Sequence, residues 1–243
     1  MIKTLINNKW ELLLPLHRSE LTFWPYWEAK RLQALHDQIV NDNHYNRSKK
    51  QTIIDIGAEE GDLTALNAIW LQEYYTEENW DIHIIEPSNQ VWPSIRSIWK
   101  ANEIKSPAGC LSGFFSSRTL PGWEKGCAVW PKDAYGSIST VSGFRNLAEN
   151  GSLPEVTLDD YCTFTGAQPS ILTMDVEGSE LEVLKGAVSV LEKYHPVIYI
   201  AIHPEFMFNQ YSYYERDLHN ILIDYNYVGE HLDYSHEHHW VFR

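Results

Sequence analysis

The stretch QTIIDIGAEEGDLTALNAIWL, residues 51–71, joins a short apolar strand to a helix through a turn that contains two glycines. The strand is predicted over 52–57 and the helix over 62–75. A strand, a glycine turn and a helix in this order open the doubly wound α/β folds, whose ligands lie at the carboxyl ends of the strands. This stretch therefore predicts the fold class and also where the functional site lies.

The rest of the chain continues the alternation of strands and helices. Near-continuous apolar runs, typical of strands buried on both faces, are followed by helical patterns. The expected strands cover 52–57, 80–86, 106–115, 170–178, 196–203, 227–234 and 238–243, and the expected helices cover 62–75, 88–102, 179–194 and 213–225. The pattern predicts a mostly parallel, doubly wound seven-stranded sheet that ends in an antiparallel hairpin at its edge.

The first 50 residues differ from this pattern. Trp27, Leu32, Leu35 and Ile39 recur at helical spacings, and a polar link follows. We expect residues 1–50 to form an N-terminal helical extension that packs on, or covers, a main domain of residues 51–243.

Composition limits the classes of function. The formal charge is −14 over 243 residues, which disfavours a nucleic-acid backbone or an anionic membrane as partner. No apolar run approaches the length of a membrane span. The three cysteines show no C-x-x-C spacing, as expected of reduced thiols in a cytoplasmic protein. The oligomeric state is not predictable from these features.

The spacing of the turn selects the kind of ligand. A dinucleotide fingerprint is G-x-G-x-x-G, whereas this turn is Gly57-Ala-Glu-Glu-Gly61, with two acids inside it and Asp55 just before it. So many acids suit a cationic ligand without phosphates, such as the sulfonium cofactor S-adenosylmethionine. Glu86 ends the next strand, where a carboxylate can accept hydrogen bonds from both ribose hydroxyls. An NAD-dependent oxidoreductase is the alternative, because Glu86 would serve either cofactor.

A second stretch resembles a known family. Residues 156–187, VTLDDYCTFTGAQPSILTMDVEGSELEVLKGA, closely resemble a segment of the FkbM family of methyltransferases, and IIDIGAEEGDLT and IIEPSNQVW resemble its first and second motifs. The resemblance implies a class I, Rossmann-like methyltransferase that acts mostly on oxygen, often on hydroxyls of sugars or of polyketide and glycan products. It implies that S-adenosylmethionine is bound by Asp55, Gly57, Ala58, Gly61 and Glu86, with Ser112 as a candidate for the adenine end.

Two positions depart from the family pattern. Thr173 stands where the family often has lysine, and Ala201 stands where an acid is common. Both lie at carboxyl ends of predicted strands. A protein that binds the cofactor but has lost catalysis is therefore a second hypothesis.

Transfer to a hydroxyl requires a group that removes its proton. His203 ends the fifth strand and Asp175 the fourth, so we expect His203 to be the base and Asp175 to orient it. His203 could instead be a structural histidine. Asp175 with Glu177 or Asp160 could also hold Mg²⁺. Alternatively, Glu177 lies beside a helix start at which Ser179 and Glu182 form a capping box.

Two further segments carry expectations. Residues 113–155 contain six aromatic side chains suited to stacking on a saccharide or another small-molecule acceptor: Phe114, Phe115, Trp123, Trp130, Tyr135 and Phe144. Near the C-terminus lie His231, His236, His238 and His239. We expect these histidines to alternate along an edge hairpin rather than to bind a metal.

Overall fold

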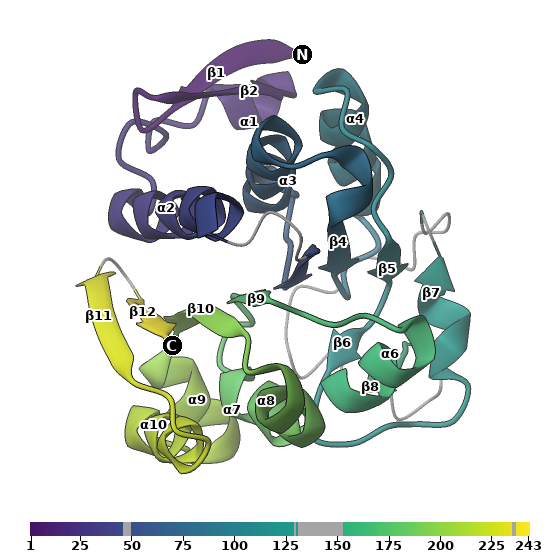
Figure 1. The fold of residues 1–243 in the computed structure, drawn as a ribbon, viewed down its shortest axis with the longest axis vertical. Helices are drawn as coiled ribbons and strands as arrows, with labels where there is room; N and C mark the ends of the chain where they lie inside the picture. Colours follow the sequence, from purple (N-terminus) through teal and green to yellow (C-terminus); the bar gives the residue numbers. More distant parts are fainter. Residues whose placement is uncertain (46–49, 129, 131–152, 235–236) are drawn as a thin grey trace.

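The computed structural model describes residues 1–45, 50–128, 130, 153–234 and 237–243. An eight-stranded sheet runs through the molecule in the order β11-β12-β10-β9-β3-β4-β5-β7 (Figure 1). Its strands are β3 (Gln51–Ile56), β4 (Trp80–Ile85), β5 (Gly109–Leu111), β7 (Cys127–Ala128), β9 (Ile171–Met174), β10 (Val197–Ile202), β11 (Gly229–Tyr234) and β12 (His238–Phe242).

The doubly wound, mostly parallel sheet is confirmed. β3 pairs in parallel with both β4 and β9, β9 with β10, and β4 with β5. β11 and β12 form the expected antiparallel hairpin, and β12 also pairs antiparallel with β10. The eighth strand, β7, was not predicted and adds two residues antiparallel to β5.

Helices cover both faces of the sheet (Figure 1). On one face lie α2 (Ala29–Tyr45), α3 (Asp62–Tyr74) and α4 (Trp92–Ala101). The other face carries α6 (Leu158–Thr165), α7 (Glu180–Lys185), α8 (Val188–Tyr194), α9 (Pro204–Tyr211) and α10 (Glu215–Asp224). Each face buries its own apolar cluster, which is why β3 and β9 are apolar on both sides.

The single helix predicted over 179–194 is two helices. Gly186 separates α7 from α8, and a Cβ atom at this position would lie 2.0 Å from the carbonyl oxygen of Ser116. The chain therefore passes too close to its neighbour for any side chain here. Helix α9 was also unexpected; it begins at Pro204, directly after β10, with proline in its first turn.

The N-terminal region contains a hairpin that the sequence interpretation missed. β1 (Ile2–Ile6) pairs antiparallel with β2 (Trp10–Leu14), and the short helix α1 (Leu16–Ser19) follows. Asn7 and Asn8 have φ of 50° and 56°, as a tight hairpin turn requires. This Asn-Asn pair between two alternating runs was the overlooked signal. The predicted amphipathic helix is present as α2, and its apolar face joins the cluster of α3 and α4.

Short elements complete the fold. Two-residue strands β6 (Phe114–Phe115) and β8 (Glu155–Val156) pair in parallel, and two 3₁₀ turns cover Glu77–Asn79 and Trp123–Gly126. No helix among the described residues combines the length and the apolar composition needed to cross a bilayer.

Candidate functional site

A cavity of about 1180 Å³ opens at the carboxyl ends of the central strands. The turn after β3, the end of β4 and the turn after β9 form one side of it. The segment between α1 and α2 contributes Phe23, Tyr26 and Trp27 to another side. In this sheet order β3 lies between β4 and β9, so the cavity occupies the switch point where doubly wound folds bind ligands.

Gly57 allows the turn after β3 to pass close to the turn after β9. Its φ is +84°, and a Cβ atom here would lie 1.8 Å from the carbonyl oxygen of Asp175. The backbone N–H groups of Gly57 and Ala58 both donate to the carbonyl of Ile85, at 2.9 and 3.2 Å. Both residues border the cavity. Gly57 therefore satisfies two separate constraints, a left-handed backbone and a close approach of two chain segments.

Gly61 is the N-cap residue of α3 and packs against α4. Its φ is +85°, and a Cβ atom would lie 3.0 Å from a side-chain carbon of Ile95 on α4. Unlike Gly57 and Ala58, it does not border the cavity among the described residues.

Asp55 lies in β3, just before the turn that begins at Gly57. It is buried, and it accepts hydrogen bonds from the hydroxyls of Thr64 and Thr173. Burial raises the pKa of Asp55, and these two hydrogen bonds oppose that rise. Thr173, one of the two departures from the family pattern, therefore anchors Asp55 inside the sheet. Asp55 is not among the residues that border the cavity.

Glu86 follows β4 and borders the cavity. One carboxylate oxygen accepts the backbone N–H of Glu59 at 2.9 Å, and the other accepts that of Ser88 at 2.7 Å. Burial raises the pKa of Glu86 to about 8; the two backbone hydrogen bonds lower it, and the charges of Glu59 and Asp55 add to the rise. These hydrogen bonds fix the carboxyl group between two turns, with free lone pairs remaining on both oxygens.

Ser112 is buried beside the site and does not border the cavity among the described residues. Its hydroxyl donates to the side-chain oxygen of Asn89. The residues that follow it, from Phe114 to Arg118, do border the cavity.

The floor of the cavity gathers several ionisable groups. Asp175 and Glu177 border it, and Nε2 of His203 lies 3.6 Å from an oxygen of Asp175 and 3.7 Å from one of Glu177. His203 is only 5% exposed and stacks on Phe206. Its Nδ1 lies 2.8 Å from the buried carboxylate of Glu180. The structure thus brings together His203, Asp175 and Glu177.

The carboxylates around His203 decide its charge. Burial alone would lower the pKa of His203, but Glu180, Glu237 and Asp175 outweigh burial and raise it to about 11. Burial raises the pKa of Asp175 to about 7, against the lowering effect of Arg31 and His203. The imidazole is therefore a cation at neutral pH, and its charge balances part of the surrounding negative charge.

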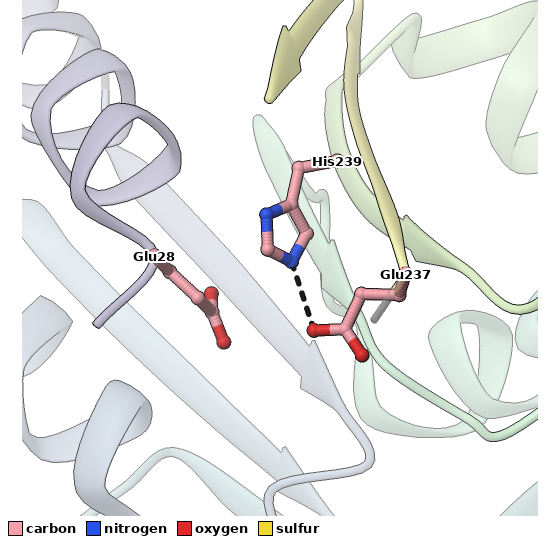
Figure 2. Close-up of side chains that lie close together, drawn as sticks. All are labelled: Glu28, Glu237 and His239. Atoms are coloured by element: carbon pink, nitrogen blue, oxygen red, sulfur yellow. Dashed lines mark hydrogen bonds and ion pairs between the residues drawn. The ribbon is translucent and has the colours of Figure 1, made fainter. Parts of the chain in front are cut away.

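Arg31, Glu28 and Glu237 also belong to this cluster, and sequence reasoning missed all three. Arg31 of α2 is fully buried, donates to Glu28 at 2.8 Å and lies 4.0 Å from Asp175. Arg31 shares the apolar face of α2 with Leu35, four residues on, and a buried arginine on such a face was the available signal. Figure 2 shows Glu28 from the N-terminal segment facing Glu237, which precedes β12, and His239 of β12.

The partners of the neighbouring acids Asp159 and Asp160 show what each of them does. Asp159 accepts the backbone N–H groups of Ser189 and Val190, both at 2.9 Å, and so caps α8. Asp160 is exposed on α6 and accepts a hydrogen bond from the hydroxyl of Thr119, and it does not belong to the cluster of Asp175, Glu177 and His203.

The capping box expected at the start of α7 is wrong. Ser179 makes no capping hydrogen bond; its hydroxyl lies 3.0 Å from that of Tyr211. Glu182 instead accepts from Lys185 and Tyr213.

The C-terminal histidines have separate surroundings. His239 is buried, with Nε2 3.0 Å from Glu237 and Nδ1 2.6 Å from Asp233. His238 pairs with Glu215 at 2.9 Å. His236 lies outside the described residues.

The six aromatic side chains predicted to stack on an acceptor also lie in different surroundings. Phe114 and Phe115 border the cavity, whereas Trp123 packs on Phe164 and Trp130 on Trp99. Tyr135 and Phe144 lie outside the described residues.

The walls of the cavity are strongly acidic. Nine aspartate or glutamate residues but only two arginines are among the described residues that border it. Both arginines are already paired: Arg18 with Asp62 and Arg118 with Glu155. The site therefore favours neutral or cationic ligands over anionic ones.

This architecture defines a class. A mostly parallel sheet with an antiparallel terminal hairpin, a glycine turn after the central strand and an acid after the next strand define the Rossmann-like fold of class I methyltransferases.

Comparison with known proteins gives the family. The model of the FkbM methyltransferase domain matches residues 55–238, so the chain belongs to this family of S-adenosylmethionine-dependent methyltransferases. No curated protein matches the sequence significantly.

Solved structures agree on the fold. The chain is similar to the FkbM methyltransferase of Methylobacillus flagellatus KT, with a TM-score of 0.53 and 15% identity over 89% of this chain and 59% of that one. It therefore spans less than two thirds of that protein's length. A METTL16 methyltransferase domain aligns with a TM-score of 0.51 and 10% identity over 95% of this chain and 71% of that one.

Proposed function

We propose that this chain transfers the methyl group of S-adenosylmethionine to a hydroxyl of an uncharged or cationic polar acceptor, such as a sugar, a glycan or a glycosylated small molecule. The observation that carries the proposal is one acidic cavity that joins Glu86 and the Gly57 turn to Asp175 and Glu177. Methyl transfer is an in-line displacement, so the main catalytic task is to hold the acceptor oxygen in contact with the methyl carbon and in line with the carbon–sulfur bond.

The cofactor end is the turn after β3 together with Glu86. The ribose hydroxyls would donate to the carboxylate of Glu86, which the N–H groups of Glu59 and Ser88 hold in place. The acidic walls suit the positive sulfonium and ammonium groups. The same acids disfavour the pyrophosphate of NAD, and the family membership gives the oxidoreductase alternative no support. In this proposal Asp55, Gly61 and Ser112 act indirectly, because they shape the turn and the neighbouring strand end.

Cofactor affinity should increase with pH through the titration of Glu86. Its pKa of about 8 means that the free protein carries a protonated Glu86 at pH 7, whereas acceptance of two ribose hydroxyls favours the carboxylate. Each pH unit below 8 should weaken binding by up to about tenfold. Calorimetric titration with S-adenosylhomocysteine from pH 6 to 9 tests this. The pH dependence should disappear in Glu86→Gln, and an affinity independent of pH in the wild type would contradict the assignment.

The acceptor end lies between the floor and the aromatic side chains near α1 and α2. Phe23, Tyr26 and Trp27 border the cavity, and Tyr26 is 80% exposed. Flat rings beside carboxylates suit sugars, whose C–H faces stack on aromatic rings and whose hydroxyls donate to acids. Because the walls are acidic, we expect neither nucleic acid nor a phosphorylated compound as acceptor.

Tyr26→Ala should raise the KM for the acceptor at least about fivefold and leave cofactor affinity unchanged, because a stacked ring is worth about 1 kcal/mol. Steady-state kinetics with the best acceptor, together with calorimetry for the cofactor, measures both effects. Tyr234→Ala is the matched control, since Tyr234 is equally a surface tyrosine but lies on β11 away from the cavity. Equal effects of the two substitutions would remove Tyr26 from the acceptor site.

The proton of the acceptor hydroxyl would pass to a carboxylate on the cavity floor. Asp175 and Glu177 border the cavity, whereas His203 lies behind them. The sequence assigned the base to His203 and the orienting role to Asp175; we propose the reverse, with His203 as the group that positions Asp175. In this assignment His203→Gln lowers turnover and spares cofactor binding.

The two departures from the family pattern do not favour a loss of catalysis. Thr173 bonds Asp55, and Ala201 is buried opposite His239 in the β10–β12 register, where its small side chain leaves room for the imidazole. Neither residue borders the cavity among the described residues.

A magnesium ion held by Asp175 with Glu177 or Asp160 does not fit the arrangement. Asp160 is on α6 and bonded to Thr119, and the third group beside the two acids is the imidazole of His203. Magnesium prefers an all-oxygen octahedral shell. We route no step through Mg²⁺.

The decisive experiment is a turnover assay with S-adenosylmethionine and a panel of acceptors: neutral sugars and glycosides, amino sugars, sugar phosphates and RNA. We expect methylation of a neutral or amino-bearing sugar and none of the anionic acceptors. Tight cofactor binding without transfer to any acceptor would favour the impaired-protein alternative. A cytoplasmic location remains a prediction from the sequence.

A further inference from the structure

We propose that the floor of the cavity is a binding site for a divalent transition-metal ion, with Nε2 of His203 and carboxylate oxygens of Asp175 and Glu177 as its protein ligands. The role of the ion rests on the function proposed above: an open coordination position faces the cavity and takes the acceptor hydroxyl. The binding of the ion itself does not depend on that function.

The spacing of the three ligand atoms fits one ion. Nε2 of His203 lies 3.6 Å from Oδ1 of Asp175 and 3.7 Å from Oε2 of Glu177, and the ligand atoms of the three residues all lie within 4.8 Å of one another. Ligands held about 2.1 Å from an ion lie about 3 to 3.5 Å apart, so the two distances from Nε2 need to shorten by only a few tenths of an ångström. The two carboxylates would close on the ion by rotation of the Glu177 side chain, which is 60% exposed. Asp175 and Glu177 border the cavity, so the open side of this triad faces the ligand.

His203 supplies an independent observation that points to a ligand. The side chain is 5% exposed, and its Nε2 makes no hydrogen bond with any described residue. Oε2 of Glu237 lies 3.1 Å from Nε2 and forms an ion pair with it, but the contact does not meet the geometry of a hydrogen bond. Leaving a buried ring nitrogen without a hydrogen bond costs free energy, which a coordinated cation would recover.

The ligand side chains are also held by neighbouring residues through the atoms that do not face the ion, as in known metal centres. Nδ1 of His203 lies 2.8 Å from Glu180, a completely buried carboxylate. This carboxylate–histidine pair would fix the ring. The ion would displace the Nε2 proton that the free protein carries at neutral pH, and the lone pair of Nε2 would then face the ion. Oδ2 of Asp175 lies 4.0 Å from Arg31, so its other oxygen, Oδ1, is the one turned toward His203.

A second group of possible metal ligands holds the first group in place and does not itself bind the ion. Glu28, Glu237 and His239 also lie close together (Figure 2). Glu28 is paired with Arg31 at 2.8 Å, and one oxygen of Glu237 is bonded to Nε2 of His239 at 3.0 Å. His239 is held in turn by Asp233 at 2.6 Å. Because the atoms of this group are engaged with one another and with a buried arginine, they orient Glu237 beside His203.

The ligand set selects the kind of ion. One imidazole with two carboxylates suits manganese to zinc among the divalent first-row metals and is unsuited to magnesium. A bound ion would orient the acceptor hydroxyl and make it more acidic. As the oxygen forms its bond to the methyl carbon, the carbon–sulfur bond breaks and sulfur keeps the electron pair. The hydroxyl proton passes to the carboxylate oxygen of Asp175 that does not hold the ion, and the ion is unchanged.

The test is metal binding by the full chain after removal of metals with a chelator, without cofactor or acceptor. Calorimetric titration with Zn²⁺ and with Mn²⁺ should show one saturable site per chain, and Mg²⁺ should bind at least about 100-fold more weakly. Glu177→Gln should weaken Zn²⁺ binding at least about tenfold. The side chain of Glu177 is 60% exposed, so this variant should fold normally. His203→Ala should abolish the site, with circular dichroism to verify folding.

Two controls decide where the ion binds. Asp160→Asn should leave the affinity unchanged, because Asp160 lies on α6 outside the triad. His238→Ala should also leave it unchanged; His238 belongs to the C-terminal histidines, which could bind Zn²⁺ adventitiously. The proposal is overturned if neither Zn²⁺ nor Mn²⁺ binds saturably, or if binding is lost in His238→Ala and kept in Glu177→Gln. Methyl transfer that proceeds fully in chelator would leave the proposed function intact and remove the catalytic role of the ion.

Discussion

Glu86→Ala should abolish binding of S-adenosylmethionine, with a loss of affinity of at least about 100-fold. The substitution removes the acceptor for both ribose hydroxyls. It also removes the oxygens that bind the backbone N–H groups of Glu59 and Ser88, so both turns at the cofactor end lose an anchor. Calorimetric titration with S-adenosylmethionine and S-adenosylhomocysteine measures the effect.

A matched control separates this effect from a general loss of negative charge. Glu73 is an exposed acid on α3, and Glu73→Ala should bind the cofactor as the wild type does. If folded Glu86→Ala bound within a few-fold of the wild-type affinity, Glu86 would not be the ribose-binding acid, and the cofactor would have to lie elsewhere in the cavity.

Gly57→Ala should be the most destabilising single-methyl change at the site, with a loss of at least about 3 kcal/mol in the free energy of unfolding. Two costs add. Alanine at a φ of +84° costs about 1–2 kcal/mol, and the new methyl carbon would meet the carbonyl oxygen of Asp175 at 1.8 Å. Relieving that overlap moves the turn after β3 away from the turn after β9, so cofactor binding should fail as well. Urea unfolding followed by circular dichroism measures the stability.

Gly166→Ala is the control that isolates the backbone cost. Gly166 has a φ of +73°, but a Cβ atom there meets nothing within 4 Å, so only the left-handed conformation is penalised. We expect a loss of about 1 kcal/mol. Equal losses in the two variants would show that the close approach to Asp175 relaxes without cost, and that the glycine serves backbone conformation alone.

Much of the sheet could be predicted because its signals are local. β3, β4, β9 and β10 are short apolar runs followed by helical patterns, and strands buried on both faces need such runs. Of the features that were not predicted, one had a local signal in the sequence and another depends on a tertiary contact. The N-terminal hairpin had an overlooked Asn-Asn turn, whereas the break between α7 and α8 depends on the carbonyl of Ser116, about 70 residues away in sequence, which no local pattern reveals.

The part of the site that follows the carboxyl ends of the parallel strands could be predicted from the sequence. The topology of a parallel sheet places the residues after β3, β4 and β9 at one edge, so Gly57, Glu86 and Asp175 could be selected without coordinates. The exchange of roles that we propose between His203 and Asp175 could not. It depends on Glu180 and Glu237, which approach His203 from α7 and from the segment before β12.

The sequence by itself determined the fold class, the position of the cofactor turn and the family, because each is written in contiguous residues whose spacing matches the geometry of a strand, a turn or a helix. The tertiary structure decided which charges meet. Arg31 of α2, Glu180 of α7 and Glu237 beside β12 come from three distant segments, and they surround His203 and Asp175 only after the N-terminal and C-terminal elements pack against the central strands. The charge of an ionisable group depends on its burial and on its neighbours within a few ångströms, and distance along the chain does not specify either.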